Sequence, residues 1–253
     1  MPVLCSDRLG CYDDEVYNNI QMTPMSFSDA RNLSATQLEG VAPLLQARSQ
    51  ATFSALIDAG LKILEAEDFD AATVNQIARA ASVSVGAFYG RFANKDVFFS
   101  AMQEITVSHI EADLRSLLDS PEMKESADSV FLSRLAGFWI GFYKAHRGLY
   151  LAAFQHARYR PGTWTPFKRL GWNIAGLAAN DLMPRLEACR KGRSERDIRI
   201  AFQFVNGMLV NAILNAPGPI SLDDDEMHVH IARFLCSYFG LEVPQAARRR
   251  GRS

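Results

Sequence analysis

Cysteine, strand-like alternation and long apolar runs are all scarce in this chain of 253 residues. Its four cysteines are too few for a disulfide framework and lack the spacing of a metal site, and they fit a reducing cytoplasm. No uninterrupted stretch reaches the roughly 18 apolar residues that a membrane span needs. The first 20 residues carry five charged side chains and no apolar centre, so we expect no signal peptide and a cytoplasmic protein.

The chain also has no marked excess of positive or negative charge. Its 27 Lys and Arg nearly balance its 28 Asp and Glu, which gives a net charge of −1. The chain is therefore not a polybasic coat for nucleic acids, although local basic patches remain possible. With 48% hydrophobic and 22% charged residues, the composition is that of a globular protein and not of a disordered one. The length is ample for a sizeable core.

The residues that are present predict an all-α protein. From position 46 onward apolar residues recur at helical spacing, as at Phe53, Ile57 and Leu64, and no useful β-type alternation occurs. Residues 1–45 lack this period and predict a flexible N-terminal extension with at most a short helix at 35–41. After a first helix that ends before Asp68, we expect helices at 73–81, 84–90, 94–118, 127–145, 148–158, 166–190, 195–215 and 224–239.

Two short helices joined by a tight turn give the first indication of function. Thr73 and Ser84 stand where helix N-caps are expected, and Ser82 lies in the turn between the two helices. Phe88 faces the small core of this pair, which leaves the opposite side of the second helix exposed. This is the helix-turn-helix pattern, whose second helix enters the major groove of DNA while capped helix N-termini hold phosphates.

The stretch from Asp68 to Asp96 resembles the DNA-binding signature of the TetR (tetracycline-repressor-like) family. The matching residues are Phe69, Thr73, Val74, Ile77, Ala78, Val83, Ser84, Gly86, Phe88, Tyr89, Phe92, Asn94, Lys95 and Asp96. The chain departs from the family at Asp68 and Ser82, where Gly is usual. It also departs at Val85 and Ala87, where basic or hydroxyl side chains are common. A left-handed Ser82 would cost on the order of 1 kcal/mol.

The resemblance implies an N-terminal three-helix helix-turn-helix domain at 46–95, joined to a C-terminal helical ligand-binding and dimerisation domain at 96–243, with a basic tail at 244–253. The candidate DNA-binding residues are Arg48, Thr73, Ser84, Val85, Gly86, Ala87, Tyr89, Gly90, Arg91 and Lys95. For Tyr89 the family implies a hydroxyl contact to phosphate, and the alternative is a half-buried core aromatic. Arg91 would reach a base edge, a phosphate or only water. Lys95 stands near a helix start, where a cation is unfavourable, so a phosphate partner would explain it.

Aromatic side chains are concentrated in the second half of the chain, with 11 of the 26 aromatic residues lying between positions 131 and 172. Such a cluster is either a helical core or the apolar wall of a small-molecule pocket. Because the resemblance implies an effector site, we expect a small apolar or aromatic ligand there. The candidate ligand-binding residues are Phe138, Trp139, Phe142, Tyr150, Phe154, His156 and Trp172.

The sequence thus predicts a homodimeric repressor released from a double-stranded DNA operator by a small apolar ligand. The helix at 97–118 is expected to be the only continuous element that joins the DNA-binding head (46–95) to the aromatic-rich body (96–243). The last two helices are expected to form the dimer interface around Gly207, through Phe202, Val205, Leu209, Ile213, Ile231, Leu235 and Phe239. We expect no membrane contact, metal, cofactor or catalytic residue.

Two alternatives stay open at this point. Residues 46–100 contain five basic and six acidic side chains, so the chain could be a helical interaction module or an enzyme with a degenerate DNA-binding head. It could also be a regulator of the same fold that binds no effector.

Overall fold

The computed structural model describes residues 40–42, 47–66, 69–189 and 192–243, and the expectations for the N-terminal extension before residue 40 and for the basic tail lie outside them. Within these ranges the protein is helical, apart from one isolated β-bridge. The elements are α2 (Ala47–Ala66), α3 (Val74–Ala80), α4 (Val85–Tyr89), α5 (Lys95–Asp119), α6 (Pro121–Lys124), α7 (Asp128–Ala145), α8 (Arg147–Ala157), η3 (Pro161–Trp164), α9 (Thr165–Ala188), α10 (Glu195–Asn215) and α11 (Glu226–Phe239). The predicted all-α fold class is confirmed.

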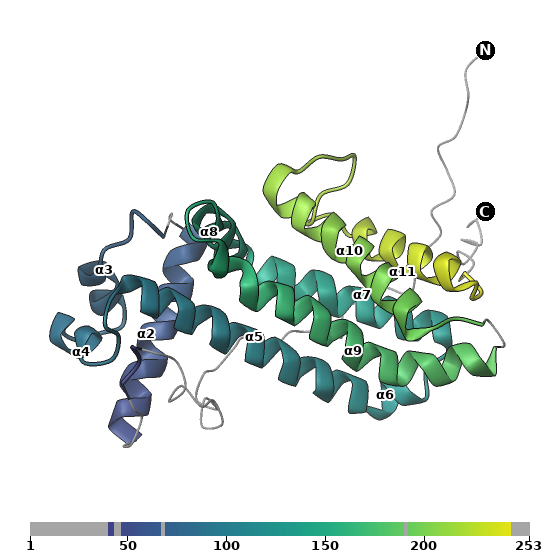
Figure 1. Cartoon of the computed structure of the whole chain (residues 1–253), viewed down its shortest axis with the longest axis horizontal. Coiled ribbons are helices and arrows are strands. Elements are labelled where there is room, and N and C mark those ends of the chain that lie inside the picture. Colours follow the sequence, from purple (N-terminus) through teal and green to yellow (C-terminus); the bar gives the residue numbers. More distant parts are fainter. Residues whose placement is uncertain (1–39, 43–46, 67–68, 190–191, 244–253) are drawn as a thin grey trace, which may run out of the picture.

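The helices are arranged as a small head and a longer body (Figure 1). Helices α2, α3 and α4 form the head, with α4 at its outer tip. Helix α5 starts in the head and runs into the body, where it packs along α9. Helix α11 packs on α7, and α10 packs on α9, so the last two helices cover one side of the body.

Local capping signals explain where most helices begin. The Thr73 side chain accepts a hydrogen bond from the Gln76 amide, and Ser84 Oγ accepts one from the Ala87 amide at 3.1 Å. Ser82 adopts φ +56, so the left-handed turn predicted from the sequence is confirmed. A capping signal that the sequence analysis left out is Ser120, which caps α6 just before a first-turn proline.

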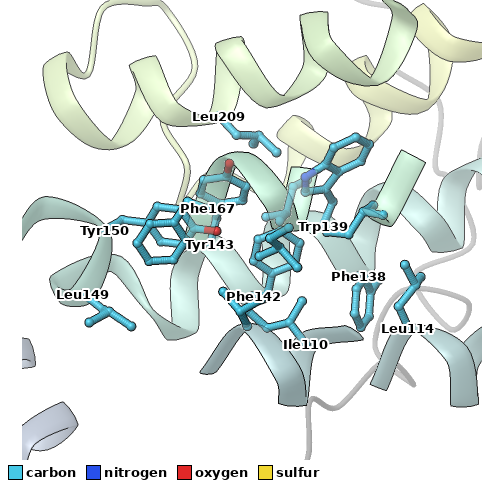
Figure 2. Close-up of a cluster of buried hydrophobic side chains, with 14 of the residues drawn as sticks. Ile110, Leu114, Phe138, Trp139, Phe142, Tyr143, Leu149, Tyr150, Phe167 and Leu209 are labelled. Carbon is cyan, nitrogen blue, oxygen red and sulfur yellow. The ribbon is translucent and has the colours of Figure 1, made fainter. Parts of the chain in front are cut away.

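The aromatic residues of the body form a packed core (Figure 2). Trp139, Phe142 and Tyr143 project from α7 and are each 1% exposed. The ring of Tyr150 on α8 lies 4.5 Å from that of Tyr143 and 4.1 Å from that of Phe167 on α9. Three helices are therefore joined by stacked rings, as expected when large apolar side chains exclude water together.

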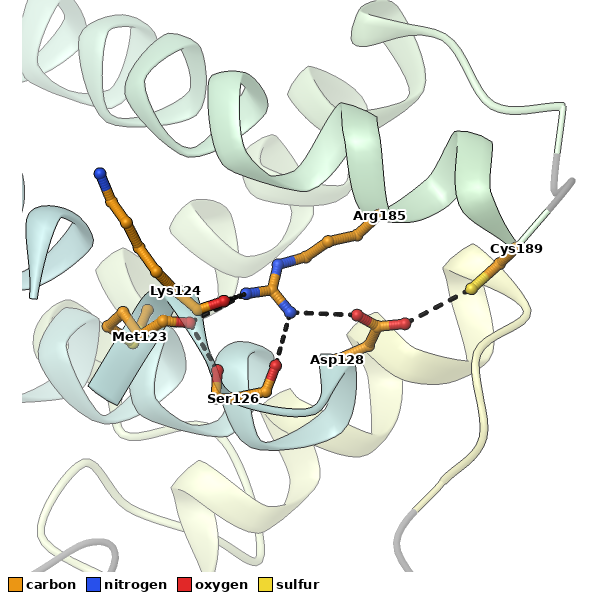
Figure 3. Close-up of polar contacts among 6 residues, drawn as sticks. All are labelled: Met123, Lys124, Ser126, Asp128, Arg185 and Cys189. Carbon is orange, nitrogen blue, oxygen red and sulfur yellow. Dashed lines mark hydrogen bonds and ion pairs between the residues drawn. The ribbon is translucent and has the colours of Figure 1, made fainter. Parts of the chain in front are cut away.

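The far end of the body is fixed by the guanidinium of Arg185 on α9 (Figure 3). It donates to the carbonyl oxygens of Met123 at 2.9 Å and Ser126 at 2.7 Å, and it pairs with the Asp128 carboxylate at 3.2 Å. It also lies 4.6 Å from the ring centre of Phe131. One side chain therefore satisfies the C-terminal carbonyls of α6 and joins α9 to the start of α7.

Helix α10 is long and apolar enough to meet the length and composition criteria for a membrane span. Its best 18-residue window has a mean hydropathy of 1.2, and 33% of that window is buried. A single such helix is weak evidence for a span, because core helices pass the same test. The low buried share indicates instead that α10 keeps an apolar face that its own protomer leaves uncovered.

Six of the seven apolar residues that the sequence assigned to the dimer interface prove to be core residues of one protomer, and the seventh, Ile213, is partly buried against that core. Phe202, Val205 and Leu209 on α10 are at most 2% exposed, and so are Ile231, Leu235 and Phe239 on α11. That interface assignment was wrong, because α10 is apolar on two sides and spacing alone does not tell which side faces the body. The exposed side of these helices carries Phe204, Met208 and Phe234.

Candidate nucleic-acid interface

The helix-turn-helix is held together by a small aromatic core. Ile77 on α3 and Phe88 on α4 are fully buried, and the Phe88 ring lies 5.4 Å from that of Phe92 and 5.2 Å from that of Phe98. In the turn, the Val83 amide donates to the Ala78 carbonyl at 2.9 Å. These contacts fix the orientation of α4 against the head.

The opposite side of α4 faces solvent. Ser84, Val85, Gly86, Tyr89 and Gly90 are exposed, whereas Ala87 is half-buried. Tyr89 is 56% exposed, so the alternative of a half-buried core aromatic does not describe it. Its ring meets the Phe88 ring edge-on at 5.4 Å, so one side of the tyrosine packs on the core while more than half of it stays exposed. The exposed face thus consists of small residues around one tyrosine, which would let the helix backbone approach a macromolecular surface such as DNA closely.

The charge of the head is unevenly distributed. From Thr73 to Lys95 the sequence contains Arg79, Arg91 and Lys95 and no acidic residue, a local charge of +3. The acidic residues of the head lie on α2, around the α2–α3 turn and at Asp96. The even balance over 46–100 therefore conceals a segment from α3 to just beyond α4 that carries two cations, Arg79 and Arg91, and no acidic residue, which favours a polyanion.

A polar cleft of about 470 Å³ lies beside α4, between it and the start of α2. It is lined by Ser49, Thr52, Ser82, Val83, Ser84, Ala87, Gly90 and Arg91. Ser49 is 7% exposed, and its hydroxyl has no hydrogen-bond partner. Hydroxyl groups next to a guanidinium suit phosphate oxygens, so the cleft extends the polar surface that α4 presents.

Not every predicted DNA-binding residue faces this surface. Lys95 Nζ donates to the Asp70 carbonyl at 3.2 Å and lies 4.4 Å from the centre of the Phe69 ring, so it points at the α2–α3 turn. Thr73 is exposed, and its side chain is engaged in the capping box of α3. Arg48 lies in α2, but its side chain is outside the described part of the structure. The sequence analysis missed Arg79, an exposed cation on α3 that a local charge count would have found.

The predicted ligand-binding residues do not share one location. Phe138, Trp139, Phe142 and Tyr150 are buried in the aromatic core (Figure 2). Phe154 is 51% exposed, and Trp172, at 64%, lies 4.0 Å below the Arg199 guanidinium. His156 packs between Phe69 and Phe99 and faces the head.

The body core nevertheless contains polar groups. Tyr150 hydrogen-bonds to Tyr143, whose hydroxyl donates to Asn206 Oδ1 of α10 at 2.5 Å. Burial raises the pKa of both phenols above their usual value, so they stay neutral. The indole Nε1 of Trp139 and the hydroxyl of Thr106 are buried without a hydrogen-bond partner. Unsatisfied groups of this kind cost about 1–3 kcal/mol each.

A family model for bacterial regulatory proteins of the tetR family matches residues 56–102, the region that holds α3, the turn and α4. The helix-turn-helix head of this chain is therefore similar to the DNA-binding region of tetR-family regulators. The match spans the head and the start of α5 and does not extend into the rest of the body.

Among known relatives, an uncharacterized HTH-type transcriptional regulator of Bacillus subtilis, YwcC, is 34% identical over 89 residues. The match covers 32% of this chain and 40% of that protein. A TetR-family regulator from Mesorhizobium loti has the same fold, with a TM-score of 0.63 at 17% identity over 77% of this chain and 98% of that one. The regulator FadR from Bacillus halodurans gives a TM-score of 0.52 at 18% identity, over 79% and 97%. Both likenesses to solved TetR-type structures show the fold alone.

Proposed function

We propose that this protein is a sequence-specific DNA-binding transcriptional regulator. The observation that carries the proposal is the solvent-facing side of α4, where Tyr89 stands exposed above the buried Phe88. In a helix-turn-helix such a face enters the major groove and the partner helix crosses the backbone. The cations Arg79 and Arg91 and the hydroxyl-lined cleft support contacts to phosphate beside that groove.

We also propose that the protein acts as a homodimer through α10 and α11. Phe204 is 57% exposed, Met208 40% and Phe234 38%, and the rings of Phe204 and Phe234 lie 6.3 Å apart. Gly207 lies on the same face, and a Cβ added there would meet nothing within 4 Å. Burying this face against its two-fold copy would remove large apolar side chains from water and bring two heads into one complex.

The proposed effector is a small apolar molecule that binds in the body and releases the DNA. Support comes from the aromatic core and from the unpartnered Trp139 Nε1, which a ligand acceptor would satisfy. FadR, one of the structural neighbours, is described as a fatty acid degradation regulator, so an acyl chain is one ligand class to test. Repression, rather than activation, is the mode usual in the family. We also propose that the head ends at residue 95 and the body begins at residue 96, with α5 as the helix that connects them.

The direct test is salt-dependent binding of the full chain to the DNA upstream of its own gene. We expect an affinity that falls steeply between 50 and 200 mM salt, because each phosphate contact releases counterions. Specific binding should survive an excess of unrelated DNA. Equal binding to both DNAs, or no binding to either, would contradict sequence-specific DNA binding. It would favour the alternative that the protein is a helical interaction module.

A further inference from the structure

A three-residue segment ahead of the helix-turn-helix is paired with the end of the recognition unit. Val41 forms an isolated antiparallel bridge with Phe92. The Ala42 amide donates to the Arg91 carbonyl at 2.9 Å, and the Ala93 amide donates to the Gly40 carbonyl at 3.1 Å. We call residues 40–42 the brace. It lies outside the family-matched region at 56–102, so the family likeness does not account for it.

The central residue of the brace is buried in the apolar core of the head. Val41 is 9% exposed and belongs to the same apolar core as the fully buried Phe92. The ring of Phe92 lies 5.4 Å from that of Phe53 on α2 and 4.9 Å from that of Phe98 on α5. The bridge therefore connects the brace to the point where the aromatic core of the head meets the end of α4.

Gly40 is required for this close approach. It adopts φ +82, a conformation that side chains disfavour, and a Cβ there would lie 3.0 Å from Val97 Cγ2. Gly192 has a similar φ of +59, but a Cβ there would meet nothing within 4 Å. Both glycines have a positive φ that strains other residues, but only at Gly40 would a side chain collide with a neighbour. Gly192 therefore provides a matched control.

We propose that the brace is a positioning element for DNA binding, which holds the end of α4 and Arg91 in the orientation that the major groove requires. The proposal rests on the DNA-binding function proposed above. Helix α4 has only five residues and does not hold its shape by itself. Its start is fixed by the Ser84 cap and its middle by Phe88. The chain leaving it is held by the bonds of the Arg91 and Phe92 amides to the Phe88 carbonyl, by the burial of Phe92 and by the two backbone hydrogen bonds of the brace.

The test compares brace variants with controls in the full chain, using the best-binding DNA fragment from a selected pool. Ala42→Pro removes the amide that bonds to Arg91, and Gly40→Val forces a side chain against Val97. Each should weaken DNA binding about 3- to 10-fold, the range of one or two lost hydrogen bonds. Gly192→Val should leave the affinity unchanged. Wild-type affinity in both brace variants, at equal folded fraction, would overturn the proposal.

Two further measurements separate positioning from general stability. Met123→Ala truncates a buried side chain at the far end of the body, so it should lower the melting temperature without changing DNA affinity. Hydrogen exchange of the Gly90, Phe92 and Ala93 amides should accelerate in the brace variants and not in Met123→Ala. If the wild type binds no DNA, the proposed function fails, and the exchange result alone decides whether the brace holds α4. Unchanged exchange would then overturn the brace as well.

Discussion

His156 Nε2 lies 3.0 Å from the carboxylate of Asp70, and this contact ties the body to the head. The imidazole stacks on Phe99 at 5.0 Å and meets the edge of Phe69 at 5.5 Å. Its Nε2 is buried and makes no hydrogen bond, so the contact with Asp70 is an electrostatic attraction. The end of α8 is thereby fastened to the α2–α3 turn.

Further contacts join the segment after α8 to the first turns of α5, close to where the head meets the body. Arg160 pairs with Asp96, and Gln103 Nε2 donates to the Thr163 carbonyl at 2.8 Å. Helix α8 also crosses α2 closely. Helix α5 runs continuously from the head into the body, as expected, and the packing of α8 on α2 adds a second connection that is not covalent. A ligand that shifts α8 in the body would move the head directly, which is what a change in DNA affinity requires.

The crossing of α2 and α8 gives the first prediction. A Cβ on Gly148 would lie 1.9 Å from the Leu64 carbonyl oxygen, so Gly148→Ala must push α8 away from the head. We expect a loss of about 1–3 kcal/mol in the free energy of unfolding and weaker DNA binding. Gly162→Ala is the control, because its Cβ would meet nothing within 4 Å. Denaturant unfolding of both variants checks this, and equal stabilities would contradict the close crossing.

The second prediction concerns assembly. Phe204→Asp combined with Phe234→Asp places charges on the exposed face of α10 and α11, so a dimer buried there should dissociate. Sedimentation velocity should show a monomer that still has the helical content of the wild type. Tyr159→Asp introduces a charge at an 82% exposed aromatic on the head side and should leave the dimer intact. A double variant that remains dimeric would place the interface elsewhere.

The third prediction concerns pH. Burial, and then the positive charge of His109, lower the pKa of His146 from 6.5 to about 4. The unfolded chain therefore binds the proton more readily, so stability is full above pH 6.5 and falls as the pH drops toward 4. The loss is about 3 kcal/mol at most. Burial raises the pKa of Asp113, a carboxyl that also interacts with His109, and this acts in the opposite direction.

The comparison with His146→Gln isolates that titration, since Asp113 contributes to both proteins. The variant should have a flatter dependence of unfolding free energy on pH between 6.5 and 4. Parallel curves for wild type and His146→Gln would show that His146 does not stay neutral in the folded state.

The fourth prediction concerns Arg185. Its replacement by Met removes the guanidinium donor from the carbonyls of Lys124 and Ser126 and one of the donors from that of Met123, so unfolding should become easier by about 2–3 kcal/mol. Arg147→Met is the control, because its pair with Asp223 is solvent-exposed and contributes roughly 0–1 kcal/mol. Thermal unfolding distinguishes the two, and a similar small effect for both would mean that water replaces the guanidinium.

The sequence predicted those features whose signals are local. Thr73, Ser84 and the left-handed Ser82 each act within a few residues, so caps, turn and helix order could be predicted without tertiary information. Lys95 could not be placed, because its partner Asp70 is 25 positions away. The exposed side of α10 was also missed, since Phe202 and Phe204 are chemically alike and only packing shows which of them is buried.

The most direct measurement is selection of binding sites from random double-stranded DNA by the full chain, repeated with Tyr89→Phe and Arg91→Ala. The wild type should enrich a two-fold symmetric site with half-site centres roughly 34–36 Å apart. Tyr89→Phe should bind the same site more weakly by about 1–3 kcal/mol, because it loses one hydrogen bond to a charged phosphate. Arg91→Ala should alter the enriched sequence if the guanidinium reads a base. Failure of the wild type to enrich any sequence, or identical affinity and preference in all three proteins, would contradict the assignment of α4 as the recognition helix.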